Sequence, residues 1–263
     1  MITWHLDPSV MIGLLLLTGA YVAGVMMPRR ATRGQVASFL SAVLVLFIAL
    51  ESPLDTAGDR YLLSAHMVQH LLLVLVVPPL LLLGTPDWVF RPLLGVAPLA
   101  AAARVLMRGP VAFAVYNVVF SLAHLPVFFD LTLRNEGVHI AEHLVFIATG
   151  VLAWWPVLSP VPELPRLAYP FQMLYVFLQT LPCSLVGALI TLSGVVLYAP
   201  YAVAPRVWGP VTPLGDQQIG GLAMWIGGSL YYFLAFMVIF FLWAQHEERD
   251  GRHLYVVRDP SGS

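Results

Sequence analysis

Two histidine pairs in this 263-residue sequence have a spacing suited to metal binding. His66 and His70 lie in the run HMVQH, and His139 and His143 lie in the run HIAEH. Residues four apart share one face of a helix, with Cβ atoms about 5–6 Å apart, so both imidazoles of a pair can reach one ion. Two such helices side by side would present four imidazoles to a shared site. We therefore predict a metal centre with His66, His70, His139 and His143 as its ligands.

Further polar groups are predicted near this centre. His124 and Asp216 fall at the ends of other apolar stretches and are candidate additional ligands. Glu142, inside the run HIAEH, is expected to act as a ligand or as the carboxylate that orients a ligating ring. A single histidine at the end of a membrane span is commonly bonded to a backbone carbonyl, whereas ionisable groups gathered at one depth are costly and usually functional. The number of such groups favours a metal or cofactor site.

Neighbouring side chains indicate which metal would bind. Met67 follows His66, Met224 lies in the last apolar stretch, and thioethers favour Cu(I) over Zn(II). Gln217 is placed to hydrogen-bond a ligating imidazole from outside the ligand set. Thioether ligation would thus favour copper, with zinc less favoured. Haem b is also less favoured, because four residues amount to about 6 Å of helix rise and two stacked haems would collide. A single haem held by one histidine from each helix would leave the other two paired histidines without a role.

The composition assigns these residues to a membrane protein. Residues of the types AVILMFWYC make up 59% of the chain and charged residues only 10%, whereas about 25% of an ordinary soluble domain is charged. The formal net charge is -1 and lysine is absent, which excludes a nucleic-acid partner. Cys183 is the only cysteine, so the sequence holds neither a disulfide nor a thiolate cluster for a metal.

Charge-free intervals long enough to cross a bilayer define the elements that carry the histidines. A span needs about 20 apolar residues. The interval between Arg91 and Arg104 is shorter, which predicts a loop or an interfacial helix there. We predict one all-α integral membrane domain, a bundle of seven transmembrane helices, followed by a tail over residues 246–263. The predicted spans are residues 9–27, 35–51, 62–84, 109–128, 138–157, 169–192 and 217–243.

The arginines predict the orientation of this bundle, because cytoplasmic segments of membrane proteins are enriched in basic residues. With the N-terminus outside and the C-terminus in the cytoplasm, only Arg60, Arg134 and Arg206 lie in outer segments. This orientation places both histidine pairs, His124 and Asp216 near the outer surface. The inner segments then hold Arg29, Arg30, Arg33, Arg91, Arg104, Arg108, Arg166, Arg249, Arg252 and Arg258.

Four runs together resemble the multi-spanning CtaG family of cytochrome c oxidase assembly factors. They are HMVQHLLLVLVVPPLLLLGTP, HLPVFFD, VHIAEHLVFIATG followed by WWP, and DQQIGGLAMW. The resemblance covers the chain from about Tyr61 to Trp243 and rests on the order and spacing of these short motifs. It implies a bacterial plasma-membrane protein that supports maturation of haem-copper oxidase by handling copper, with oxidase subunits as partners. It also implies an assembly factor rather than an enzyme.

Two other functions are compatible with the same residues. A membrane-embedded zinc hydrolase acting on lipids would use metal-bound water as its nucleophile and Glu142 as its general base. A b-type haem protein would carry electrons. The sequence predicts contact with the lipid bilayer in every case and predicts no oligomeric state.

Overall fold

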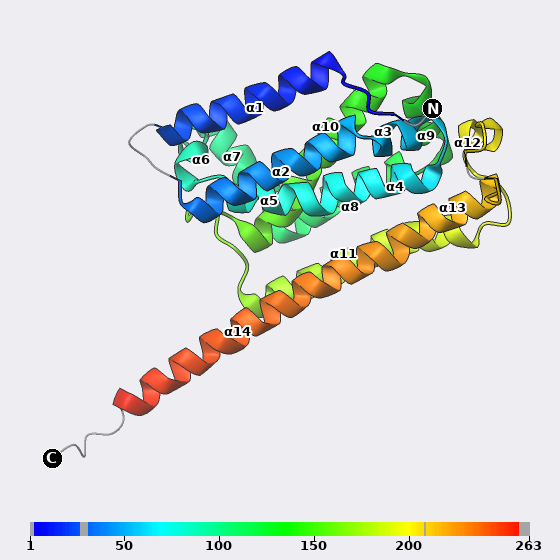
Figure 1. Cartoon of the computed structure of the whole chain (residues 1–263). Helices are drawn as coiled ribbons and strands as arrows, with labels where there is room; N and C mark the ends of the chain where they lie inside the picture. The colour runs from blue at the N-terminus through cyan, green and yellow to red at the C-terminus, as the bar shows by residue number, and fades with distance from the viewer. Residues whose placement is uncertain (1–2, 27–30, 208, 258–263) are drawn as a thin grey trace.

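The computed structural model describes residues 3–26, 31–207 and 209–257, and every regular element in these ranges is helical (Figure 1). Arg29, Arg30 and Arg258, three of the arginines used to predict the orientation, lie outside the described residues. The elements are α1 (Pro8–Met26), α2 (Arg33–Glu51), α3 (Pro53–Arg60), α4 (Leu63–Leu71), the π-helix η1 (Leu72–Val76), α5 (Val77–Gly84), α6 (Asp87–Leu94), α7 (Ala97–Leu106), α8 (Gly109–Ala123), α9 (Pro126–Arg134), α10 (Glu136–Leu158), α11 (Tyr169–Leu192), α12 (Ala199–Val203), α13 (Pro213–Leu222), the π-helix η2 (Ala223–Gly228) and α14 (Ser229–Val257).

Six helical segments in the described ranges are long and apolar enough to cross a membrane, and two bent helix pairs raise the number to eight if each pair is one span. The predicted all-helical class is confirmed, and the predicted count of seven lies between these limits. The interval between Arg91 and Arg104 falls in the pair α6 and α7, which meet at 117°. At the other end of the chain, α14 extends as a helix into the predicted tail.

The predicted span over residues 109–128 is bent rather than straight. Helix α8 ends at Ala123, and α9 begins at Pro126 and runs at 71° to it. Proline has no backbone N–H and disfavours helical geometry in the residue before it. Leu125 accordingly has extended backbone angles, φ -69° and ψ 135°. The bend leaves His124 at the corner between the two helices.

The segment α4–η1–α5 is central to the bundle. Helix α5 packs on α2 and α10, and α4 packs on α3 and α13. Gly150 permits the contact with α10, since a Cβ there would lie 2.7 Å from Cγ of Pro78. The π-helix η1 ends just before Pro78 and Pro79. Proline has no backbone N–H, so neither residue can donate a hydrogen bond to a carbonyl oxygen of the preceding turn.

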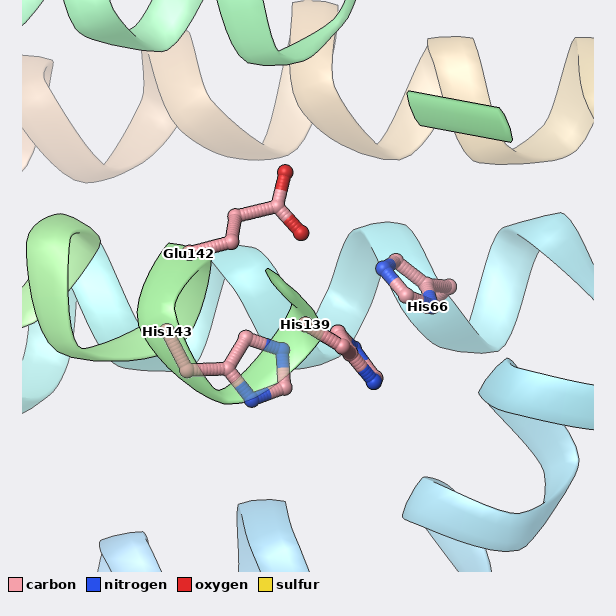
Figure 2. A group of neighbouring side chains, drawn as sticks. All are labelled: His66, His139, Glu142 and His143. Carbon is pink, nitrogen blue, oxygen red and sulfur yellow. The ribbon is translucent and has the colours of Figure 1, made fainter. Parts of the chain in front are cut away.

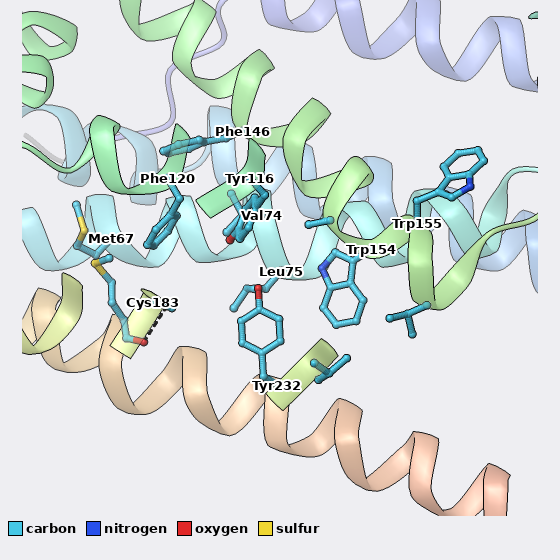
Figure 3. Close-up of a cluster of buried hydrophobic side chains, with 14 of the residues drawn as sticks. Met67, Val74, Leu75, Tyr116, Phe120, Phe146, Trp154, Trp155, Cys183 and Tyr232 are labelled. Atoms are coloured by element: carbon cyan, nitrogen blue, oxygen red, sulfur yellow. Dashed lines mark hydrogen bonds between the residues drawn. The ribbon is translucent and has the colours of Figure 1, made fainter. Parts of the chain in front are cut away.

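A buried apolar cluster fills the space between this segment and α8, α10, α11 and α14 (Figure 3). It includes Met67, Phe120, Phe146, Trp154 and Tyr232. Two of its members, Phe129 and Phe146, contact the rings of His66 and His70. Figure 1 shows that α3, α9 and α12 lie together at one end of the bundle, here called the α3 end, and that α14 terminates at the opposite end.

Candidate metal centre

The two histidine pairs meet between α4 and α10, near the α3 end. Within each pair the ring centroids of His66 and His70, and of His139 and His143, are 4.3 Å apart. Between the helices, the His66 ring lies 5.4 Å from His139 and 6.4 Å from His143, and the His70 ring lies 5.6 Å from His143. The structure therefore brings the four predicted ligands into one cluster.

Four side chains in this cluster could hold one ion together. One potential ligand atom from each of His66, His139, Glu142 and His143 lies within 4.8 Å of the others (Figure 2). Three imidazoles and a carboxylate are a donor set that zinc and copper both accept. His70 lies outside this group of four but next to it, with its Nε2 atom 3.9 Å from Oε2 of Glu142.

Most of the ring nitrogens in the cluster are buried and lack a hydrogen-bond partner among the described residues. His66 and His70 are 0% and 1% exposed. Within the part of the chain that the structure describes, neither ring nitrogen of these two residues has a hydrogen-bond partner, and neither does Nε2 of His139 or His143. A buried polar group without a partner costs about 1–3 kcal/mol. A bound ion would satisfy several of these nitrogens at once, so the residues present fit a metal.

His124 joins the cluster from the corner between α8 and α9. Its ring lies 5.7 Å from that of His70 and is 4% exposed. The Nδ1 atom lies 2.7 Å from the carbonyl oxygen of Phe120. A carbonyl only accepts, so Nδ1 carries the proton and Nε2, which has no partner, keeps its lone pair. His124 therefore presents a free acceptor nitrogen on the His70 side of the cluster.

Asp216 lies near the cluster but is engaged elsewhere. Its carboxylate accepts hydrogen bonds from the backbone N–H groups of Leu63, at 2.6 Å, and Ser64, at 3.4 Å, and from the Ser64 hydroxyl. These groups form the first turn of α4, which has no cap from its own preceding residue. A carboxylate there satisfies orphan N–H groups and complements the helix dipole. Asp216 thereby anchors the helix that carries His66 and His70.

The remaining accessory residues serve packing and loop geometry. Gln217 accepts from the Leu197 N–H at 2.7 Å and donates to the Val195 carbonyl at 3.0 Å, so it holds the loop after α11. Met67 and Met224 belong to the apolar cluster, where the Cys183 thiol donates to the Met224 carbonyl (Figure 3). The potential ligand atoms of His66, His139, Glu142 and His143 are nitrogen and oxygen.

A cavity of about 500 Å³ borders the cluster at the α3 end. His139 and His143 line it together with Asp55, Asp59 and Glu136. Sequence reasoning did not select Asp55 and Asp59 as functional residues. The only signal was their spacing of four on the short charged segment before the first histidine pair, which by itself is typical of a solvated helix face.

Comparison with known proteins identifies the family of the chain. Residues 19–246 match the model of the cytochrome c oxidase caa3 assembly factor family, Caa3_CtaG. The chain therefore belongs to this family, as the resemblance of its motifs predicted.

Curated relatives do not extend this assignment. The chain is 24% identical to uncharacterized protein ML1998 of Mycobacterium leprae and 23% identical to uncharacterized protein Mb0105 of Mycobacterium bovis, over 94% of its own length in each case. It spans 40% of the length of each of these relatives. No solved structure matches the chain.

Replacing Asp216 with alanine should destabilise the protein, because two backbone N–H groups and a hydroxyl lose a buried acceptor. We expect a loss of at least about 1.5–3 kcal/mol, the range for one hydrogen bond to a charged group. Thermal unfolding in detergent measures it, with exposed Glu163→Ala as the control. An Asp216→Ala protein as stable as the control would contradict the anchoring role.

The pH dependence of stability should report Asp55, which lies in α3, outside the candidate spans. Burial, with a further contribution from nearby Asp59, raises the pKa of Asp55 from 3.8 to about 7. Between about pH 4 and 7 the folded state therefore holds a proton that the unfolded chain releases, and the free energy of unfolding falls as pH rises through this window.

We expect Asp55→Asn to flatten this decline, because asparagine still accepts from the Gln69 amide but does not ionise. Unfolding temperatures of both proteins between about pH 4 and 8 provide the measurement. Parallel curves for the two proteins would show that another group causes the decline.

Proposed function

We propose that this chain binds copper between α4 and α10 and supports its insertion into haem-copper oxidase. Membership of the oxidase assembly factor family supports a role in oxidase assembly. The observation that carries the copper site is the buried group of His66, His139, Glu142 and His143, whose imidazoles lack hydrogen-bond partners on the nitrogens that could ligate. Imidazole is a good copper ligand. The proposed role is that of an assembly factor rather than an enzyme, with oxidase subunits as partners.

We also propose the topology predicted from the arginines, with seven spans, the N-terminus outside and the C-terminus in the cytoplasm of a bacterium. The bent pair α8 and α9 then forms one span, and α6 and α7 lie at the inner surface. In this orientation the α3 end faces outward. The cavity beside His139 and His143 then opens toward the side from which external copper arrives.

The burial of the imidazoles suggests how the protein takes up the ion. The side chain of His139 is 13% exposed and lines the cavity, whereas His66 and His70 are almost fully buried. His70 is joined to the group through Glu142, and His124 lies beyond it. An ion would therefore meet His139 and His143 first and the interior imidazoles afterwards.

Metal analysis of the purified protein tests this proposal. Wild-type protein given copper should retain it, and a variant with alanine at His66, His70, His139 and His143 should lose it. His246→Ala, at the other end of the bundle, is the matched control. Because four substitutions could impair folding, His139→Ala alone is measured as well, with thermal unfolding to verify that it folds. Loss of copper from this folded variant supports the site.

Equal copper in the wild-type and four-alanine proteins would overturn the proposal. Zinc in place of copper, together with lipid hydrolysis that the four-alanine variant lacks, would favour the hydrolase. A Soret band in the visible spectrum would favour haem b.

A further inference from the structure

We propose that Asp59 is a positioning residue of this metal centre: its carboxylate selects the Nδ1–H tautomer of His66 and His139, so that both rings direct Nε2 to the ion. The inference rests on the proposed copper site, because the choice of tautomer has a role only if an ion binds there. The geometry behind it involves only residues of the chain.

One carboxylate faces both helices of the centre. Oδ1 of Asp59 lies 3.5 Å from Nδ1 of His66, and Oδ2 lies 3.6 Å from Nδ1 of His139. The side chain of Asp59 is 28% exposed, whereas that of His66 is 0% exposed. Asp59 therefore stands between the cavity and the buried imidazoles, with one oxygen for each histidine pair.

The position of Asp59 is fixed by close packing of α3 on α4. A Cβ at Gly58 would lie 3.0 Å from both the Cα and the N atom of His66, so a larger residue there would require the two helices to shift slightly apart. The Tyr201 hydroxyl donates to the Gly58 carbonyl at 2.6 Å, and the Leu62 N–H donates to the Ala57 carbonyl at 2.8 Å. The end of α3 is thus held from α12 and from its own following turn.

The chemistry of a neutral imidazole explains what this placement does. Such a ring carries one N–H and one lone pair. A carboxylate accepts hydrogen bonds, so the nitrogen facing Asp59 is favoured as the N–H, and Nε2 of His66 and His139 becomes the ligating atom. Metal-ligating histidines commonly donate their second nitrogen to a carboxylate or a backbone carbonyl. His124 follows the same arrangement, with the Phe120 carbonyl as its acceptor.

The two contacts are longer than hydrogen bonds, whose N···O distances are about 2.7–3.2 Å. Hydrogen bonds at functional sites often tighten only when the ligand is bound. In the structure Asp59 acts on the rings through its charge and its proximity. We expect both contacts to shorten in the loaded centre.

Asp55 provides a matched control. It lies one turn before Asp59 on α3 and lines the same cavity. Its Oδ1 atom accepts from the Gln69 amide at 2.8 Å, and the ion pairs with His66 and His139 involve Asp59. Measured above pH 7, where Asp55 is ionised, Asp55→Asn and Asp59→Asn therefore each remove one carboxylate from the cavity, and only the second removes the group that faces two imidazoles.

Nitrogen NMR of the metal-free protein, labelled with ¹⁵N-histidine and held at a pH where the rings are neutral, tests the proposal without copper. We expect His66 and His139 to be Nδ1–H tautomers in the wild-type protein and in Asp55→Asn. In Asp59→Asn the side chain offers one acceptor and one NH2 group, so at least one of the two rings should change tautomer. Signals are assigned with single His→Gln variants. Nε2–H tautomers in the wild type, or unchanged tautomers in Asp59→Asn, would overturn the proposal.

Copper affinity gives a second and independent readout. Loss of such an outer carboxylate typically weakens metal binding about 10–100-fold, and we expect this for Asp59→Asn but not for Asp55→Asn. Equal weakening by both variants would assign the effect to the charge of the cavity and overturn the positioning role. If the wild-type protein binds no copper at all, the proposed function fails, while the tautomer measurement still decides the role of Asp59.

Discussion

The burial of several imidazoles beside one another is the constraint that the surrounding helices must satisfy. Five histidine rings and the Glu142 carboxylate lie in one cluster at the end of an apolar helical bundle. Each buried nitrogen without a partner costs about 1–3 kcal/mol. Such a cluster requires helices that are held firmly and, in the proposed function, an ion that offers the missing interactions.

The contacts around α4 meet the first of these requirements. Asp216 of α13 caps its first turn, and Gln69 donates to the Ala49 carbonyl at 2.9 Å and to Asp55. Gly58 lets α3 press against the backbone of His66. Segments that are far apart in the sequence therefore converge on one short helix. Their shared effect is to fix two imidazoles whose own hydrogen bonds are missing.

Hydropathy and spacing predicted much of this arrangement. Long apolar intervals produced the all-helical class because every backbone polar group must be paired inside a membrane. The four-residue spacing identified the two histidine pairs because helix periodicity is a local property. The bend at Pro126 was missed because the length of a charge-free interval does not indicate whether the helix within it is straight or bent. Pro126, two residues after His124, was the available signal.

Long-range contacts were beyond the reach of sequence reasoning. Asp216 has the residue type of a ligand, yet it caps a helix 153 positions away in the chain. Met67 adjoins a histidine in sequence, but neighbouring helical residues do not share a face, and its thioether packs in the apolar cluster. Asp59 carried no signal beyond an ordinary charged segment. Only the packing of α3 on α4 reveals that its two oxygens face two histidine pairs.

The central claim is that α4 and α10 share one copper ion through imidazole nitrogen and a carboxylate. X-ray absorption at the copper edge of the loaded wild-type protein tests it most directly. We predict a first shell of nitrogen and oxygen with the outer-shell scattering of several imidazoles, and a smaller imidazole contribution in His143→Ala. A first shell of sulfur, or one of oxygen without imidazole scattering, would contradict the account.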